Sequence, residues 1–69
     1  MANFTERLIE LRQEKTLSQK ALAMVINASE SAINKWELGK RSPTADSIIA
    51  LAKFFGVTTD YLVGLSDYK

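Results

Sequence analysis

The chain has 69 residues, 46% of them hydrophobic and 25% charged, a size and composition that predict a single domain with one small hydrophobic core. It contains no cysteine and no histidine, which excludes disulfide bonds, the usual zinc sites and catalysis by a Ser–His or Cys–His pair, so we expect neither an enzyme nor a cofactor. The net charge of +1 does not identify a partner, and no long apolar run predicts a secretory signal or a membrane span, so we expect a cytoplasmic protein.

Five helices are predicted in chain order, and the starts of four of them are marked by a hydroxyl side chain. The first helix runs from about Phe4 to Lys15. Each later helix begins at a Ser or Thr that can accept a hydrogen bond from a first-turn N–H, with apolar or small residues placed to pack across the cap. These four caps are Ser18, Ser29, Thr44 and Thr58.

The helix ends are predicted from residues that adopt left-handed backbone easily. All three glycines follow an apolar periodic stretch, where a helix commonly ends in that conformation; they are Gly39, Gly56 and Gly64. Asn27 is expected to do the same between the second and third helices, because Asn tolerates left-handed backbone best after Gly. Ala23 and Ala28 are small where these two helices must approach each other. Residues 18–38 therefore predict two short helices joined by a tight turn.

Apolar residues recur with helical spacing in all five segments, whereas no stretch alternates as a strand would. The fold class is therefore predicted to be all-α. The expected core residues are Phe4, Leu8, Leu11, Leu22, Val25, Ile26, Ile33, Trp36, Ile48, Leu51, Ala52, Phe55, Tyr61 and Leu62.

The third helix, from Glu30 to about Leu38, is expected to have two different sides. Ile33 and Trp36 fall on one side at 100° per residue, and the opposite side is short, polar and of mixed charge. Its residues are Glu30, Ser31, Asn34 and Lys35. Asn and Lys side chains can reach base edges in the major groove of DNA. Composition and spacing alone fit a solvated face of an ordinary helical corner equally well.

Three motifs carry a resemblance that is more specific: RLIELRQEKTLSQKALA, SESAINKWELGKRSP and LAKFFGVTTDYLVG. Over residues 4–65 the chain resembles the Xre/Cro/phage-repressor class of helix-turn-helix domains. The resemblance implies a compact five-helix, lambda-repressor-like domain in which the second and third helices form the helix-turn-helix. It also implies binding as a homodimer to an inverted-repeat operator in double-stranded DNA, with half-sites about one helical turn apart.

The resemblance also implies roles for individual residues. Base contacts are expected from Glu30, Ser31, Asn34 and Lys35, and phosphate contacts from Gln19, Ser29, Lys40, Arg41, Ser42 and Thr44. Gln19 would also brace the third helix. Ser29 and Thr44 cap helices whether or not DNA is bound. The carboxylate of Glu30 would repel phosphates unless it accepts a hydrogen bond from a cytosine amino group, and its place in a first turn is explained by the helix dipole alone.

Two further positions are informative at the end of the third helix. In similar domains Arg12 and Glu37 form a partly buried salt bridge, so we expect Glu37 to be structural and unavailable to DNA. Leu38 stands where the family commonly has Asn, and unlike Asn it cannot cap the helix or contact the DNA backbone.

The sequence thus predicts one domain over residues 1–69 with its helix-turn-helix at 18–38, either complete or the N-terminal part of a longer regulator. Its expected function is transcriptional regulation, as a repressor of phage or bacterial type, with no small-molecule ligand evident. The alternative is a protein-interaction module of the same fold, such as an antitoxin or anti-regulator. Four apolar residues outside the core are expected to be exposed and would serve that role, or equally a dimer interface or a junction to a further domain: Leu38, Val63, Leu65 and Tyr68.

Overall fold

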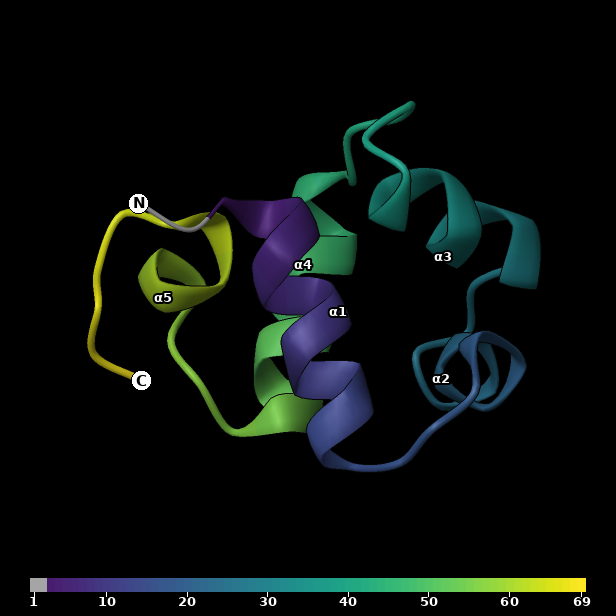
Figure 1. The fold of residues 1–69 in the computed structure, drawn as a ribbon, viewed down its shortest axis with the longest axis horizontal. Coiled ribbons are helices and arrows are strands. Elements are labelled where there is room, and N and C mark those ends of the chain that lie inside the picture. The colour runs from purple at the N-terminus through teal and green to yellow at the C-terminus, as the bar shows by residue number, and fades with distance from the viewer. Residues whose placement is uncertain (1–2) are drawn as a thin grey trace.

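The computed structural model describes residues 3–69, which form five α-helices and no strand. The helices are α1 (Phe4–Glu14), α2 (Gln19–Val25), α3 (Glu30–Glu37), α4 (Ala45–Phe55) and α5 (Thr59–Val63). Helix α1 crosses the middle of the molecule, with α2 and α3 on one side of it and α5 on the other (Figure 1). Helix α2 packs on α3, and α5 packs on both α1 and α4. The all-α, five-helix prediction is confirmed.

Every helix starts at a side-chain cap. The four predicted hydroxyls each accept a hydrogen bond of 3.0–3.1 Å from the N–H three residues later, which confirms Ser18, Ser29, Thr44 and Thr58 as N-caps. The start of α1 has a fifth cap that was not predicted, because Asn3 Oδ1 accepts from the Glu6 N–H at 2.9 Å. An Asn followed three residues later by Glu was the available signal.

The turn between α2 and α3 has the predicted left-handed residue, Asn27, at φ 57°. The Ala28 N–H donates to the Ala23 carbonyl at 2.8 Å and the Asn27 N–H to the Met24 carbonyl at 3.4 Å, so the turn itself satisfies two of the last carbonyls of α2. The three glycines also have positive φ, as expected. One left-handed residue was not predicted: Thr16, after α1, has φ 53° although it is β-branched, a conformation that costs such a residue about 1–2 kcal/mol.

The core is built from all five helices, and one expected member is absent from it. Val25 is 53% exposed, which makes its assignment to the core wrong. The buried side of α2 is formed by Leu22 and Ala23 with Ile26 packed beside them, and Val25 lies roughly 100° around the helix from the middle of that side. The buried hydrophobic residues are Leu8, Leu11, Leu22, Ala23, Ile33, Trp36, Leu51, Ala52, Phe55, Tyr61 and Leu62, whereas Phe4, Ile26 and Ile48 are half-buried against them.

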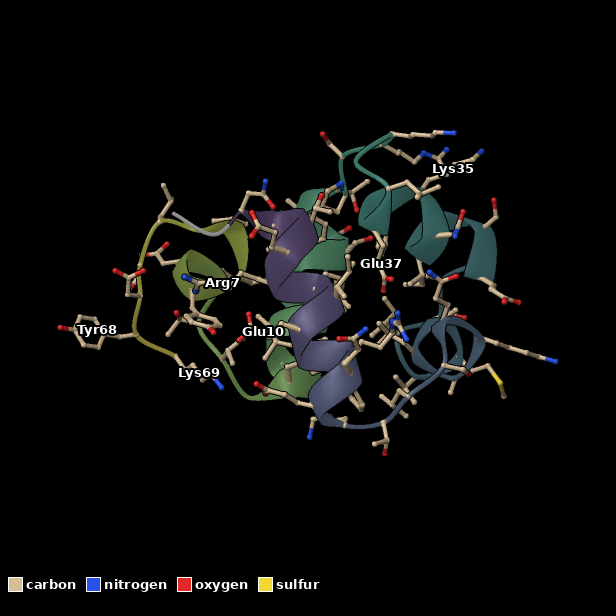
Figure 2. The ribbon with its side chains drawn as sticks, viewed as in Figure 1. Arg7, Glu10, Lys35, Glu37, Tyr68 and Lys69 are labelled. Carbon is tan, nitrogen blue, oxygen red and sulfur yellow. The ribbon has the colours of Figure 1, made fainter. Side chains whose placement is uncertain are left out.

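Arg7 is a buried charge that the sequence pattern did not single out, and its side chain lies between α1 and α5 (Figure 2). Its guanidinium donates to the Tyr61 carbonyl at 2.9 Å and the Ser66 carbonyl at 3.1 Å, and lies 3.8 Å from the centre of the Tyr61 ring. A weaker ion pair joins it to the exposed carboxylate of Asp67 at 3.3 Å. Arg7 thereby holds the segment after α5 against α1.

Within residues 3–69, no helix combines the length and hydrophobicity that crossing a bilayer requires. The same residues contain no group of three or more carboxylate, cysteine or histidine side chains placed to hold a metal ion.

Candidate nucleic-acid interface

Helix α3 has one side in the core and one side in solvent. Ile33 and Trp36 are buried at 0% and 4% exposure, and Trp36 packs edge-on against Phe4 of α1. The four residues expected to contact bases are all exposed on this helix: Glu30, Ser31, Asn34 and Lys35. The structure therefore presents them together on the solvent side of a helix whose other side is anchored. Lys35 extends away from the body of the molecule (Figure 2).

Arg12 and Glu37 join α1 to α3. Arg12 Nε donates to Glu37 Oε2 at 2.6 Å and Nη2 donates to Oε1 at 2.9 Å, so the pair has two parallel hydrogen bonds. The side chains are only 16% and 6% exposed, and Glu37 points toward α1 rather than outward (Figure 2). The hydrogen bonds to Glu37 are the main reason that the pKa of Arg12 is raised, which keeps the guanidinium charged. Its Nη1 also donates to the Leu17 carbonyl at 2.8 Å, just before α2.

Gln19, in the first turn of α2, lies between this ion pair and the exposed side of α3. Its Nε2 donates to Glu37 Oε1 at 3.1 Å, and its Oε1 accepts from Asn34 Nδ2 at 3.3 Å. Both atoms of the half-buried amide are thus engaged within the protein. Gln19 therefore contacts α3 through both Glu37 and Asn34. The sequence did not predict Asn34 as a partner of Gln19.

The residues expected to contact phosphate lie at helix starts and in the loop after α3. Lys40, Arg41 and Ser42 are exposed in that loop, which continues directly from the helix end because the Lys40 N–H donates to the Lys35 carbonyl at 2.9 Å. Ser29 Oγ accepts from the Ala32 N–H, which leaves its hydroxyl proton free to donate outward. Thr44 is less available, because its hydroxyl accepts from the Ser47 N–H and donates to Ser47 Oγ at 3.0 Å.

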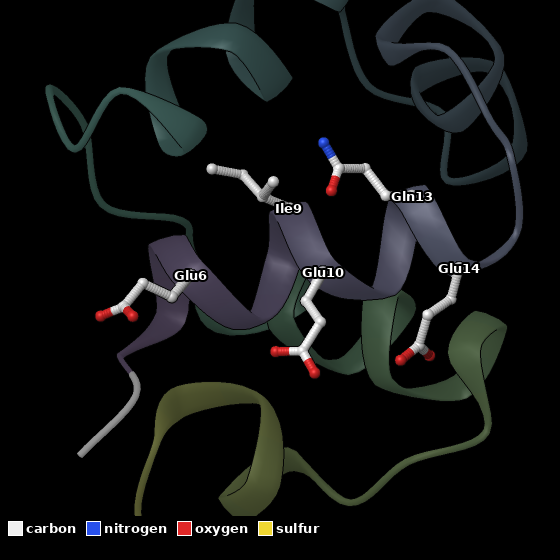
Figure 3. A pocket seen from close by; sticks show the side chains of 5 residues that line it. All are labelled: Glu6, Ile9, Glu10, Gln13 and Glu14. Carbon is white, nitrogen blue, oxygen red and sulfur yellow. The ribbon is translucent and has the colours of Figure 1, made fainter.

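Helix α1 offers a surface of opposite charge. Glu6, Glu10 and Glu14 line a shallow hollow along it together with Ile9 and Gln13 (Figure 3). Glu14 is 3.6 Å from Lys69 Nζ in an exposed pair. A row of carboxylates repels phosphate, so an interface for a polyanion belongs on α3 and the following loop, where Lys35, Lys40 and Arg41 outnumber Glu30.

The apolar residues expected outside the core are exposed with one exception. Leu38, Leu65 and Tyr68 are exposed, but Val63 is half-buried, so the expectation is wrong for that position. Val63 is the last residue of α5, one position after the fully buried Leu62. Leu38 follows α3 and borders the loop that carries Lys40 and Arg41.

Comparison with known proteins finds sequence relatives that are transcriptional regulators. A family model described as helix-turn-helix matches residues 8–62. The transcriptional activator BcrR of Enterococcus faecalis is 45% identical over 60 residues, which cover 87% of this chain and 29% of that protein. The transcriptional repressor RstR of a cryptic phage in Vibrio cholerae is 33% identical over 64 residues, covering 93% of this chain and 58% of the repressor. The chain thus spans less than two thirds of the length of these relatives.

The fold is also that of a repressor solved on DNA. The P22 c2 repressor in complex with a synthetic operator superimposes with a TM-score of 0.88 at 27% identity, over 96% of this chain and all of that one. The lambda-repressor-like fold predicted from the sequence motifs is therefore confirmed.

Proposed function

The chain belongs to the helix-turn-helix family whose model matches residues 8–62, and we propose that it binds double-stranded DNA sequence-specifically as a transcriptional regulator of the phage or bacterial repressor type. The observation that carries this proposal is the exposed side of α3. It groups Ser31, Asn34 and Lys35 toward solvent, while the opposite side of the helix is held by the core and by the Arg12–Glu37 pair. Side chains that read bases need a rigid support of this kind.

In the proposed complex α3 lies in the major groove. Ser31, Asn34 and Lys35 contact base edges there, and Glu30 does so only where a cytosine amino group faces it. Phosphates are contacted by Lys40, Arg41, Ser42 and Ser29 around the ends of α3, and Gln19 and Thr44 add to these contacts where their internal hydrogen bonds yield. Affinity then comes largely from the phosphates and falls with salt, and sequence identity comes from α3.

The proposed assembly is a homodimer on an inverted repeat. Two copies of α3 related by a two-fold axis enter the groove in half-sites centred roughly 34 Å apart, one turn of DNA. The domain over residues 1–69, with its helix-turn-helix at 18–38, would act in the cytoplasm either alone or as the N-terminal part of a longer regulator. Repression is favoured over activation by the likeness to RstR and the P22 repressor, although BcrR is named an activator.

Selection of binding sites from random double-stranded DNA tests the proposal, followed by gel-shift titration of the selected site against a scrambled one. We expect an inverted repeat whose half-site spacing gives the dimer geometry. Equal affinity for the selected and scrambled DNA, in low salt as well as at physiological ionic strength, would contradict it. A promoter fusion carrying the selected site would then distinguish repression from activation.

The protein-interaction alternative is supported by the exposed side chains of Leu38, Leu65 and Tyr68. Sedimentation with and without the selected DNA separates the two functions. A dimer that forms on DNA favours the regulator, whereas a chain that stays monomeric with every DNA offered favours the interaction module.

A further inference from the structure

We propose that Glu37, acting through Gln19, determines which amide atom of Asn34 faces outward, and that Asn34 consequently reads adenine. The inference rests on the proposed function and adds to it the base that one residue selects. Glu37 and Gln19 are positioning residues in this scheme, because neither needs to touch the base. Together with Arg12 of α1, these three side chains form one hydrogen-bonded series. It runs from Arg12 to Glu37 of α3, then to Gln19 of α2 and to Asn34 on the exposed side of α3.

The direction of the series is set at its buried end. Glu37 is paired with the Arg12 guanidinium through two hydrogen bonds, and an ionised carboxylate can only accept hydrogen bonds. The Gln19 amide group facing Glu37 must therefore be its NH2, which lies 3.1 Å from Glu37 Oε1. With the opposite orientation, two oxygens would face each other beside a buried charge.

The same reasoning applies to Asn34, at the exposed end of the series. Once the Gln19 NH2 faces Glu37, the atom that Gln19 turns toward α3 is Oε1, which cannot donate. Asn34 must then offer its own NH2, and its Nδ2 lies 3.3 Å from Gln19 Oε1. This leaves Asn34 Oδ1 facing outward, and no side chain within residues 3–69 donates a hydrogen bond to it.

An Asn held in this way fits one base best. Adenine presents the N6 amino group and N7 side by side in the major groove, so Oδ1 accepts from N6 and the second Nδ2 proton donates to N7. Guanine presents only acceptors, N7 and O6, and thymine presents the O4 acceptor and a methyl group, so both leave Oδ1 opposite a group that cannot donate. Cytosine offers its amino group alone and satisfies half of the pattern.

The test begins with the wild-type protein and its selected DNA site. Asn34→Ala identifies the base pair that Asn34 contacts, because preference disappears at that position alone. We expect adenine there, and about a tenfold loss of affinity when it is replaced by guanine. A G·C pair as the preferred pair at that position would overturn the inference.

Gln19→Met then breaks the series while leaving the Arg12–Glu37 pair in place. Met has a similar length but cannot orient Asn34, so the adenine-over-guanine ratio should fall to near one. The ratio at the position read by Lys35 should stay as in the wild type. Where Gln19 also touches a phosphate, its removal lowers the affinity for all sequences equally and cancels from these ratios. Gln13→Met, the same change on the exposed side of α1, is the matched control.

A second variant, Glu37→Gln, acts at the other end of the series. Its neutral amide can present either atom to Gln19, so the adenine preference should again fall, in a protein shown by circular dichroism to be folded at the assay temperature. An adenine-over-guanine ratio that stays at the wild-type value in Gln19→Met would overturn the inference.

A measurement without DNA separates this inference from the proposed function. By NMR, one Asn34 amide proton should exchange with water more slowly in the wild type than in Gln19→Met, and equal rates would overturn the series itself. Absence of any sequence preference in the wild type would instead overturn the proposed function.

Discussion

The Arg12 guanidinium and the Glu37 carboxylate face each other in a two-hydrogen-bond pair, at 2.6 and 2.9 Å, that fastens α1 to the C-terminal end of α3. The pair gives the buried Glu37 carboxylate a partner of opposite charge, and it aligns the first turn of α2 through the Leu17 carbonyl and Gln19. Support for the proposed reading helix is therefore partly electrostatic and not only apolar.

Breaking this pair from one side should be costly. Glu37→Gln leaves the Arg12 charge largely buried with a neutral partner, and we expect the free energy of unfolding to fall by about 2 kcal/mol. Urea denaturation measures the change, and unchanged stability would show that the pair is not structural. The double variant Arg12→Met with Glu37→Met should lose less free energy of unfolding than the two single variants together, because no charge is left unpaired.

The loss of free energy of unfolding caused by Glu37→Gln should not change with pH above neutrality. The pKa of Arg12 is raised in the folded state, chiefly by its hydrogen bonds to Glu37. The contribution of Arg12 to stability is therefore complete below the ordinary Arg pKa. It is lost only as pH rises through the still higher pKa of Arg12 in the folded state. Denaturation between about pH 7 and pH 10 should give the same difference between wild type and Glu37→Gln. A difference that shrinks steadily over this range would contradict the assignment.

Lys35 and Lys40 should affect DNA binding in different ways. Lys35→Ala is expected to relax the preference at one base pair, because Lys35 lies on the exposed side of α3. Lys40→Ala should weaken binding to all sequences alike and reduce the slope of log K against log salt by about one. Gel-shift titrations at several salt concentrations separate the two effects. Lys53→Ala, at an exposed position of α4, is the control, and interchanged behaviour of the two variants would refute the assignment.

The backbone at Thr16 offers a stabilising substitution. Its φ of 53° is unfavourable for a β-branched residue, so Thr16→Gly should raise the free energy of unfolding by about 0.5–1 kcal/mol. Asn27→Gly, at φ 57°, should gain less, because Asn already tolerates this conformation. Thermal unfolding of both variants provides the comparison. A larger gain at Asn27 than at Thr16 would count against this account.

Arg7 should be needed to hold the end of the chain. Arg7→Met removes the hydrogen bonds to the Tyr61 and Ser66 carbonyls, and leaves the first of these with only its bond from the Gly64 N–H. We expect a loss of about 2–3 kcal/mol, with faster amide exchange in residues 64–69 than elsewhere. Arg41→Met, which changes an exposed Arg, should leave stability unchanged. Uniform exchange along the Arg7→Met chain would show that the segment is held by other contacts.

Features that depend on near neighbours in the chain could be predicted from the residues alone. Ser29 caps α3 because its hydroxyl reaches an N–H three residues away, and Asn27 turns the chain because of its own backbone preference. The polar residues of α3 could be assigned to solvent because Ile33 and Trp36 define the buried side at helical spacing. The motif resemblance supplied the Arg12–Glu37 pairing, which spacing alone does not indicate.

Features that depend on how the helices pack against one another could not be predicted in this way. Val25 has the hydrophobicity of a core residue but lies away from the side of α2 that carries Leu22 and Ala23, and Arg7 is buried because α5 and the segment after it fold over α1. The orientation of Asn34 depends on Gln19, fifteen residues earlier, and on a carboxylate fixed from a third helix. Whether a side chain is buried, and which group it hydrogen-bonds to, depends on how the helices pack together. A sequence pattern reports only the preference of each helix by itself.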